Sequence, residues 1–328
     1  MIVLKFAAMY ENETFFCVLY AYFLIKLLAI SGGLMNQRIT HFFSFFILIF
    51  SSFSSYAITI STWNMEWLTL NSNEKFQSSE RHQQDFEQLN HYFSLSNSQV
   101  LAFQEVDSIE SIQKVVGNDY QIFISDRSTN PKKQFNDINQ YTGFAIHSSI
   151  PVIDPRDFSL LPNKKSSRLR YATYVIATIN EQPVHLLSVH LKSGCLGQKK
   201  NNYSCSTLEQ QTEELTDWIN EREDNNEKYL ILGDFNHTLA HPRSWLWRNI
   251  DKQANKTPIL LTKNTKGNCT AKQWKRGWPK YTTFTRLIDH GISNIAPNNF
   301  TVTQQIFKQS DVKKYQLTDH CPILFTYQ

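Results

Sequence analysis

Several apolar segments of the chain end in side chains of the types that bind metals and phosphates. The clearest is Tyr229–Leu232, which is followed directly by Gly233, Asp234, Phe235 and Asn236. A buried strand that ends in an acid and an amide is suited to binding, because an unpaired carboxylate is costly to bury. The other segments of this kind are Thr62–Glu66, Ala102–Glu105, Ser188–Ser193, Ile288–His290 and Thr318–Pro322.

Side chains of these types at the end of a strand are suited to binding a metal and a phosphate. A phosphodiester is anionic, so its hydrolysis needs neutralised phosphate oxygens, a positioned water and a stabilised leaving alkoxide. A hard cation such as Mg²⁺ supplies the first and the third, and one or two carboxylates usually hold it together with water and substrate oxygens. We therefore expect Mg²⁺ as the cofactor, with Mn²⁺ as the alternative.

The motifs and their order along the chain resemble the endonuclease/exonuclease/phosphatase superfamily of metal-dependent phosphoesterases, from Ile58 to the C-terminus. The resemblance implies a fold of the α/β (α+β) class, a four-layer sandwich of two packed mixed β-sheets flanked by helices. It also implies that the strand-end residues gather at one edge of the sandwich. Strands that are interspersed with helices and joined by hairpins fit a layered α/β fold as well.

The resemblance also assigns roles to individual residues. Its metal ligands are Glu105, Asn64, Glu66 and Asp319. Its catalytic residues are Asp234, Asn236, His320, Asp289 and His190. Asp234 would orient or deprotonate the attacking water, which Asn236 holds. Asp289 would fix the tautomer of His320, which contacts the scissile phosphate, and His190 would be a second phosphate-binding or acid group.

One position departs from the pattern of pancreatic-type deoxyribonucleases. Those enzymes carry a second Glu just before the strand that corresponds to residues 142–146, where this chain has Gln140. Gln140 can hydrogen-bond His190 but supports its charged form less well than a carboxylate. The departure favours a scheme based on the metal and Asp234 over one with two histidines.

A stretch that alternates aromatic and basic residues indicates the substrate. Cations bind phosphates and aromatic rings stack on bases, so residues 273–281 are expected to help bind nucleic acid, most plausibly DNA. The substrate-binding candidates are Trp274, Lys275, Arg276, Arg170 and Lys192. Residues 240–280 are expected to be mostly loop with a short helix, and a capping box at 206–209 predicts another helix start.

Two other function classes remain open. A sphingomyelinase-like phospholipid phosphodiesterase would use the same catalytic residues but needs an exposed apolar hairpin, for which Trp245-Leu246-Trp247 is the candidate. A toxin-type catalytic subunit is the other. The formal charge of +4 over 328 residues permits a polyanionic substrate without requiring one.

The N-terminal region has the layout of a targeting sequence. A short basic start at Met35 precedes the apolar run Phe42–Phe50 and a small-residue cleavage site that ends at Ala57. We therefore expect residues 1–57 to be an extension and signal peptide, with Met35 as the true start, and residues 58–328 to be the catalytic domain. A membrane anchor is the alternative. The predicted mature protein is a secreted or periplasmic monomer without stable membrane association.

Four cysteines lie in the predicted mature region. An even number in an exported protein suggests two disulfides, although three pairings are possible and four free thiols are the alternative. We favour Cys195–Cys205, which closes a short loop, and Cys269–Cys321, which ties a loop to the segment of His320.

Overall fold

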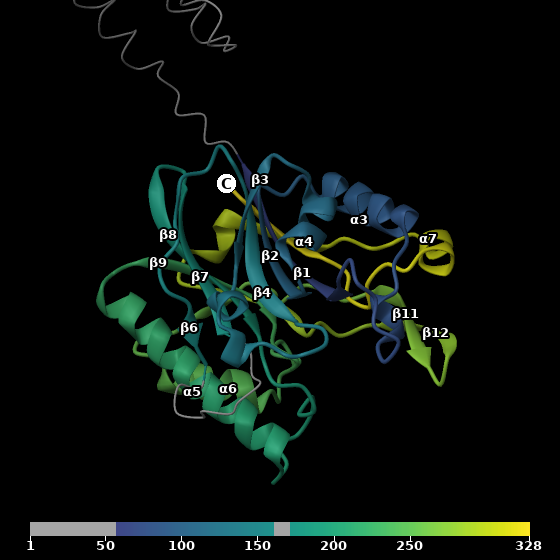
Figure 1. The fold of residues 1–328 in the computed structure, drawn as a ribbon. Coiled ribbons are helices and arrows are strands. Elements are labelled where there is room, and N and C mark those ends of the chain that lie inside the picture. The colour runs from purple at the N-terminus through teal and green to yellow at the C-terminus, as the bar shows by residue number, and fades with distance from the viewer. Residues whose placement is uncertain (1–56, 161–170) are drawn as a thin grey trace, which may run out of the picture. The chain divides into compact units, whose positions relative to one another are not determined.

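The computed structural model describes residues 57–160 and 171–328 (Figure 1). The predicted signal peptide and Arg170 lie outside these residues, apart from Ala57 at its end. Within the described part, no helix is both long and apolar enough to cross a membrane.

The first sheet has six strands, and only its central pair is parallel. Strand β1 runs parallel to β2, and every other neighbouring pair is antiparallel. The order across the sheet is β14 (Phe300–Gln304), β15 (Ile323–Tyr327), β1 (Ile58–Leu68), β2 (Val100–Val106), β4 (Tyr141–His147) and β3 (Tyr120–Ile124).

The second sheet repeats this plan with a parallel pair, β8 and β9, at its centre. The order is β10 (Ile259–Leu260), β13 (Asp289–Ser293), β9 (Lys228–Asp234), β8 (Gln182–His190), β7 (Tyr171–Ile179) and β5 (Val152–Ile153), with β6 (Phe158–Ser159) paired to β7. The two mixed sheets confirm the predicted fold class.

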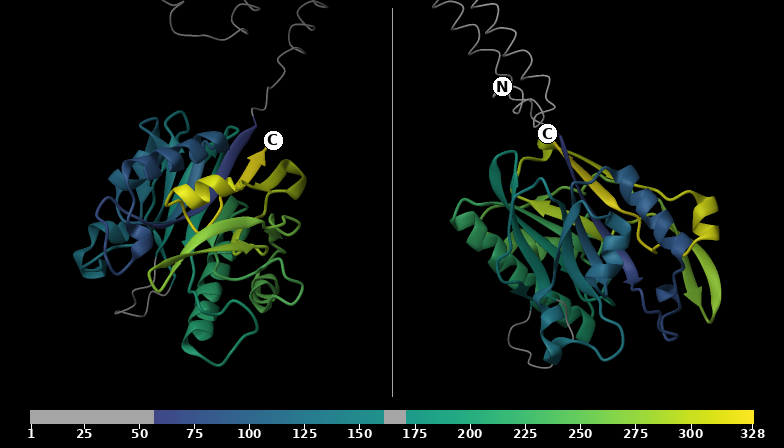
Figure 2. Two further views of the ribbon diagram at one scale, coloured as in Figure 1. Left: turned by 90° about the vertical axis from the view of Figure 1, so that its right-hand side faces the viewer. Right: turned by 45° about the horizontal axis from the view of Figure 1, so that its top comes forward.

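Helices cover the outer face of each sheet, which completes four layers (Figure 2). Apolar side chains of α3 (Gln83–Ser96) and α4 (Ile109–Val116) share a core with Trp63 and Phe103 of the first sheet. Apolar side chains of α5 (Tyr203–Asp224) and α6 (Trp245–Gln253) share a second core with residues of the second sheet. A third core lies between the sheets and includes Ile60, Ala102, Phe144, Leu186 and Leu230.

Several short elements complete the described chain. They are α7 (Gln309–Lys314), β11 (Cys269–Lys275), β12 (Trp278–Phe284), and the 3-10 turns Gln77–Ser79, Asp126–Thr129, Pro131–Lys133 and Pro297–Asn299.

Helix α5 begins four residues earlier than the capping box predicts. The side-chain oxygen of Asn202 accepts a hydrogen bond from the backbone N–H of Cys205 at 2.9 Å, so Asn202 caps the helix. Asn is among the best N-cap residues, because its short side chain satisfies an otherwise unpaired N–H of the first turn. The predicted start at residues 206–209 was therefore wrong.

Strands β11 and β12 form a two-stranded ribbon where the sequence predicted mostly loop. Arg276 and Gly277 join them, with φ angles of 53° and 80°. Two successive positive φ angles match the twist of a tight hairpin. The ribbon lies beside α7 (Figure 1), and β12 exposes Trp278, Tyr281 and Phe284 to solvent.

Both favoured disulfides are present and tie loops to the frame of the molecule. Cys195 bonds Cys205 across 10 residues, and Cys269 bonds Cys321 across 52 residues. The second bond joins the start of the β11–β12 ribbon to the residue that follows His320. The predicted pairing is therefore confirmed.

Replacing each pair of cysteines by alanine should lower the free energy of unfolding by different amounts. Loop-closure entropy gives a loss of about 4 kcal/mol for Cys269–Cys321 and about 3 kcal/mol for Cys195–Cys205, because the longer loop frees more unfolded conformations. Guanidinium unfolding at 25 °C measures both losses. A larger loss for the short loop would contradict this ranking.

Candidate active site

Strand alternation directs four polar side chains into the space between the sheets. On β1, Ile60 belongs to the core between the sheets, so Asn64 lies on the same face two pleats later. By the same alternation Gln104 follows Val100 and Ala102, His190 follows Leu186, and Asp234 follows Leu230. Asn64 is directly opposite Gln104 in the parallel pair β1–β2, and His190 is directly opposite Asp234 in β8–β9.

Two β-bulges turn further acids toward these residues. Glu105 has a φ of 59°, and the β2–β4 register shifts between Phe103 and Val106. Glu66 has a φ of 43°, within the shift between Asn64 and Leu68 of β1 and β2. A bulge adds residues to one of two paired strands and thereby re-aims a side chain; β2 has one extra residue against β4, and β1 has two against β2. Without its bulge, Glu105 would follow Phe103 toward the helices.

Asp234 is held by three donors at the end of β9. Its Oδ1 accepts from the backbone N–H of Asn236 at 2.7 Å, and its Oδ2 accepts from Nδ2 of Asn236 and of Asn64, each at 3.1 Å. Only glycine fits at position 233, because a Cβ there would lie 2.0 Å from the carbonyl oxygen of Val189. Burial raises the pKa of Asp234 to about 7, an effect that Asp289 reinforces and His320 opposes.

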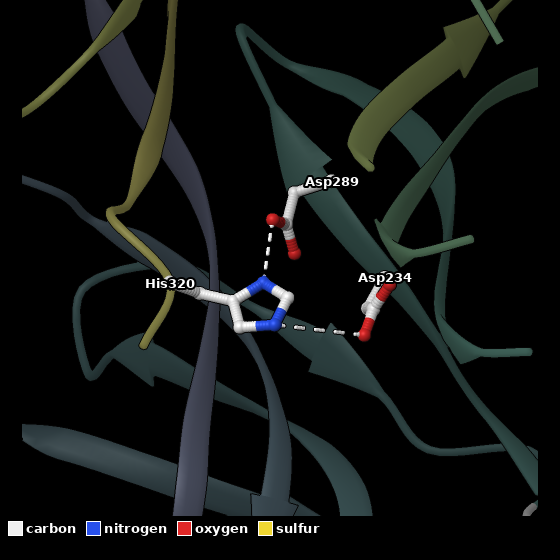
Figure 3. Close-up of side chains that lie close together, drawn as sticks. All are labelled: Asp234, Asp289 and His320. Atoms are coloured by element: carbon white, nitrogen blue, oxygen red, sulfur yellow. Dashed lines mark hydrogen bonds and ion pairs between the residues drawn. The ribbon is translucent and has the colours of Figure 1, made fainter. Parts of the chain in front are cut away.

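His320 is oriented by Asp289 (Figure 3). Its Nδ1 lies 2.7 Å from Asp289 Oδ2, and its Nε2 faces Asp234 Oδ2 at 4.0 Å. An ionised carboxylate can only accept, so Nδ1 donates the hydrogen bond. Burial lowers the pKa of His320, but Asp289, Asp319 and Asp234 together outweigh burial and raise this pKa well above its usual value. His320 therefore carries a positive charge near neutral pH.

His190 lies between two acids. Its Nε2 is 3.5 Å from Glu105 Oε1 and 3.6 Å from Asp234 Oδ2. Gln140 Nε2 donates to Glu105 Oε2 at 2.5 Å, so Gln140 orients the acid that faces His190. Whether Gln140 also supports His190 directly, as the sequence suggested, stays a prediction.

The predicted metal ligands form a crowded group of carboxylates that suits a divalent cation. Glu66 is buried, and burial, Asp319 and Glu105 raise its pKa well above the usual value, while Arg81 lowers it. Its Oε2 is buried and accepts no hydrogen bond from the described residues. Asn64 Nδ2 contacts Glu105 Oε1 at 3.3 Å. A hard cation would satisfy the unpaired oxygen and remove the repulsion between these acids.

A second acid-rich group overlaps the catalytic residues. Ligand atoms of Asp234, Asp289 and His320 lie within 4.8 Å of one another. However, a cation bound by all three would compete with the short bond between Asp289 and His320. The group that contains Glu105 and Glu66 is therefore the better candidate for holding a cation.

Arg81 is a residue of this site that the sequence analysis missed. Arg81 is half-buried between two segments of the site. Its guanidinium donates hydrogen bonds of 2.8 to 3.4 Å to five backbone carbonyls, which are those of Met65, Glu66, Trp67, Gln316 and Leu317. It thereby joins the bulge of Glu66 to the segment that leads into Asp319 and His320. No sequence motif predicts this role, because the two segments that Arg81 joins, 65–67 and 316–317, lie about 250 residues apart in the chain.

The other candidates lie around the site rather than in it. Lys192 Nζ donates to the carbonyl of Ser193, and Trp274 Nε1 donates to Gln316 Oε1. Lys275 and Arg276 are exposed at the tip of the β11–β12 ribbon. His290 is fully buried, which lowers its pKa to about 4, and it bonds Thr262, so it packs as a neutral ring.

A cleft with a volume of about 700 Å³ opens onto three of the five predicted catalytic residues. Asn236, Asp289, Asp319 and His320 line it, as do Gln273 and Phe284 of the β11–β12 ribbon. This volume lies within the range of about 300 to 1,000 Å³ that is usual for ligand pockets.

Comparison with solved structures finds the same fold in several phosphoesterases. TDP2 from Caenorhabditis elegans aligns with a TM-score of 0.55 at 15% identity, over 83% of this chain and 98% of that one. A mannosyl-6-phosphatase from Bacteroides thetaiotaomicron aligns at 0.55 and 12% identity, over 82% and 98%. A 3′ phosphatase from Neisseria, bound to a product DNA hairpin, aligns at 0.53 and 13% identity, over 83% and 100%.

A comparison with curated proteins finds no match for this sequence. The model of one protein family, described as the Endonuclease/Exonuclease/phosphatase family, matches residues 61–292. That match covers most of both sheets and every predicted site residue except Asp319 and His320. The chain therefore belongs to the Endonuclease/Exonuclease/phosphatase family.

Proposed function

We propose that this family member is an Mg²⁺-dependent phosphodiesterase that cleaves DNA as an endonuclease. Enzymes of the family hydrolyse phosphoester bonds. The observation that carries the proposal is the arrangement of Asp234, with a pKa of about 7, opposite a charged His320 beside a group of acids. A base, an acid and a cation site are the parts that phosphodiester hydrolysis requires.

Each residue has a role that follows from its contacts. Asp234 accepts the proton of the attacking water, because a carboxylate with a pKa near neutrality is both ionised in part and basic. Asn236 and Asn64 fix the orientation of Asp234. His320 neutralises a phosphate oxygen while Asp289 holds its ring. Bound beside Glu105 and Glu66, Mg²⁺ would neutralise phosphate charge and stabilise the leaving oxygen.

The β11–β12 ribbon supports a nucleic-acid substrate. Trp278, Lys280 and Phe284 lie on one face of β12, since they are separated by even numbers of residues. Phe284 lines the cleft, so this face extends outward from it for about 20 Å at the rise of a β-strand. Alternating rings and cations suit a strand of nucleotides. One solved structure of the same fold holds a DNA product.

Export is part of the proposal. Two disulfides in one domain are typical of proteins that fold in an oxidising compartment. We propose that residues 58–328 act as a secreted or periplasmic monomer after removal of the signal peptide.

A phospholipid phosphodiesterase is the second candidate function. The prediction that Trp245-Leu246-Trp247 forms an exposed apolar hairpin was wrong, because Trp245 and Leu246 lie in helix α6 and are buried in the core beneath it. The ribbon, however, is an exposed hairpin that the sequence analysis did not anticipate, and Trp278 at its tip is 77% exposed. An aromatic at a hairpin tip also suits the interface of a membrane.

Incubation of the protein with supercoiled plasmid and Mg²⁺ tests the proposed function. Nicking is expected with the wild type, and EDTA should abolish it because the cation is removed. Asp234→Asn should lower the rate by about 100-fold or more, since the base is lost. Asp251→Asn, which changes an exposed acid of α6, is the matched control. Nicking that persists in EDTA or in Asp234→Asn would contradict the assignment.

Asp289→Asn should change the pH dependence as well as the rate. The substitution removes the largest influence that raises the pKa of His320. His320 then loses its proton at a lower pH, so the alkaline limb of kcat/KM should move to lower pH and the rate loss should be greater at pH 8 than at pH 6.

Profiles of kcat/KM between pH 5 and 10 measure this effect. The control is Asp137→Asn, which also removes one carboxylate; the side chain of Asp137 is 41% exposed. An alkaline limb that stays in place in Asp289→Asn would show that Asp289 does not set the charge of His320.

Removing two charges from the ribbon should reduce the salt dependence of DNA binding. Lys275→Gln with Arg276→Asn keeps the hairpin, since Asn tolerates the positive φ at position 276. The slope of log K against log salt should fall by about 1 to 2, one counterion per lost phosphate contact. Lys114→Gln with Lys263→Gln is the control. An unchanged slope, with vesicle binding lost instead, would favour the phospholipid function.

A further inference from the structure

The cleft beside the catalytic residues has a basic part that the proposed reaction does not use. Arg243, just before α6, and Arg286, just after β12, line the same cleft as His320 and Asp289. Asp289 and Asp319 line the cleft as well, so its lining carries charges of both signs. A substrate that fills the cleft therefore meets cations as well as acids.

Both arginines are available to a ligand. Their side chains are exposed, and in the part of the chain that the structure describes no acid lies within ion-pair distance and no hydrogen-bond acceptor holds either guanidinium. Arg81, by contrast, uses its guanidinium on five backbone carbonyls. Arginine binds phosphate through two parallel hydrogen bonds, which makes it a residue of choice for phosphate recognition.

We propose that Arg243 and Arg286 form a subsite for a second phosphate, one that flanks the scissile phosphate in a nucleotide chain. The inference rests on the proposed phosphodiesterase function and names the substrate class of the same site. Phe284 also lines the cleft and is 37% exposed, so a base or sugar between the two phosphates has a ring to stack on. A volume of about 700 Å³ exceeds what one phosphodiester group needs.

The same arginines disfavour a choline phospholipid. The quaternary ammonium group of such a headgroup would enter a cleft that contains two unpaired guanidinium groups, and like charges repel. Recognition of a quaternary ammonium uses aromatic cages in which the ring faces attract the cation. The cleft offers Phe284 alongside two cations, so a flanking anion is the better match.

Two p-nitrophenyl esters that differ only in the flanking anion test the subsite. One is the p-nitrophenyl ester of thymidine 5′-monophosphate, and the other carries an additional 3′-phosphate. The wild type should hydrolyse the 3′-phosphorylated ester with a kcat/KM about tenfold higher or more, as expected for charge-assisted hydrogen bonds to the second phosphate. In Arg243→Gln with Arg286→Gln this ratio should fall toward one, mainly through KM.

Lys114→Gln with Lys263→Gln removes two exposed charges outside the cleft and should keep the wild-type ratio. A ratio of one in the wild type overturns the subsite and leaves the proposed function intact. Faster hydrolysis of p-nitrophenyl phosphorylcholine than of either nucleotide ester also overturns it. Hydrolysis of neither ester in Mg²⁺ would instead overturn the proposed function.

Calorimetry with thymidine 3′,5′-bisphosphate tests the subsite without turnover. The wild type should bind this ligand about tenfold more tightly than the variant Arg243→Gln with Arg286→Gln, because charge-assisted hydrogen bonds are lost. Circular dichroism confirms that both proteins are folded. Equal affinities would overturn the subsite whatever the outcome of the hydrolysis assays.

Discussion

The burial of Asp234 between two sheets is the constraint on which the rest of the site depends. A carboxylate at this depth is costly unless donors surround it, and the chain provides them from two places: Asn64 on β1 and Asn236 in the turn after β9. The charged His320, near the C-terminus, faces the same carboxylate at 4.0 Å. The same burial raises the pKa of Asp234 to about 7. Burial of Asp234 therefore has two effects: it lowers the stability of the fold, and it brings the pKa of Asp234 into the range that suits a base near neutral pH.

Much of this arrangement follows from strand periodicity. Asn64, His190 and Asp234 each lie an even number of residues from an apolar side chain in the core between the sheets, so strand alternation alone directs them inward. Glu105 does not obey that rule. Its inward direction depends on a positive φ in a bulge, and sequence patterns do not reveal bulges of non-glycine residues. Its place in the site was nevertheless expected, because the resemblance to a family carries information that alternation lacks.

The sequence did not predict the role of Arg81 or the β11–β12 ribbon, because both depend on contacts between segments that are distant in the chain. Arg81 is one basic residue before a helix, and its five carbonyl partners exist only once the bulge of Glu66 and the segment before His320 have met. Most of the β11–β12 ribbon was expected to be loop, and the alternation of aromatic and basic residues in 273–281 was interpreted only as a binding signal, although such alternation is also typical of a strand. It pairs with no other strand of the described chain, and the disulfide at Cys269 attaches its base to Cys321.

This attachment links the ribbon to the segment of His320 through a covalent bond. His320 immediately precedes Cys321, and Phe284 lies opposite Cys269 on the paired strands. The base of the ribbon and the imidazole of His320 are thus held together in the lining of the cleft, to which the segment just before α6 contributes Arg243. With the subsite proposed above, a ligand that has a single phosphate would leave Arg243 and Arg286 unused. A ligand with a second phosphate would engage them as well, so the proposed subsite would favour a nucleotide chain over a single ester.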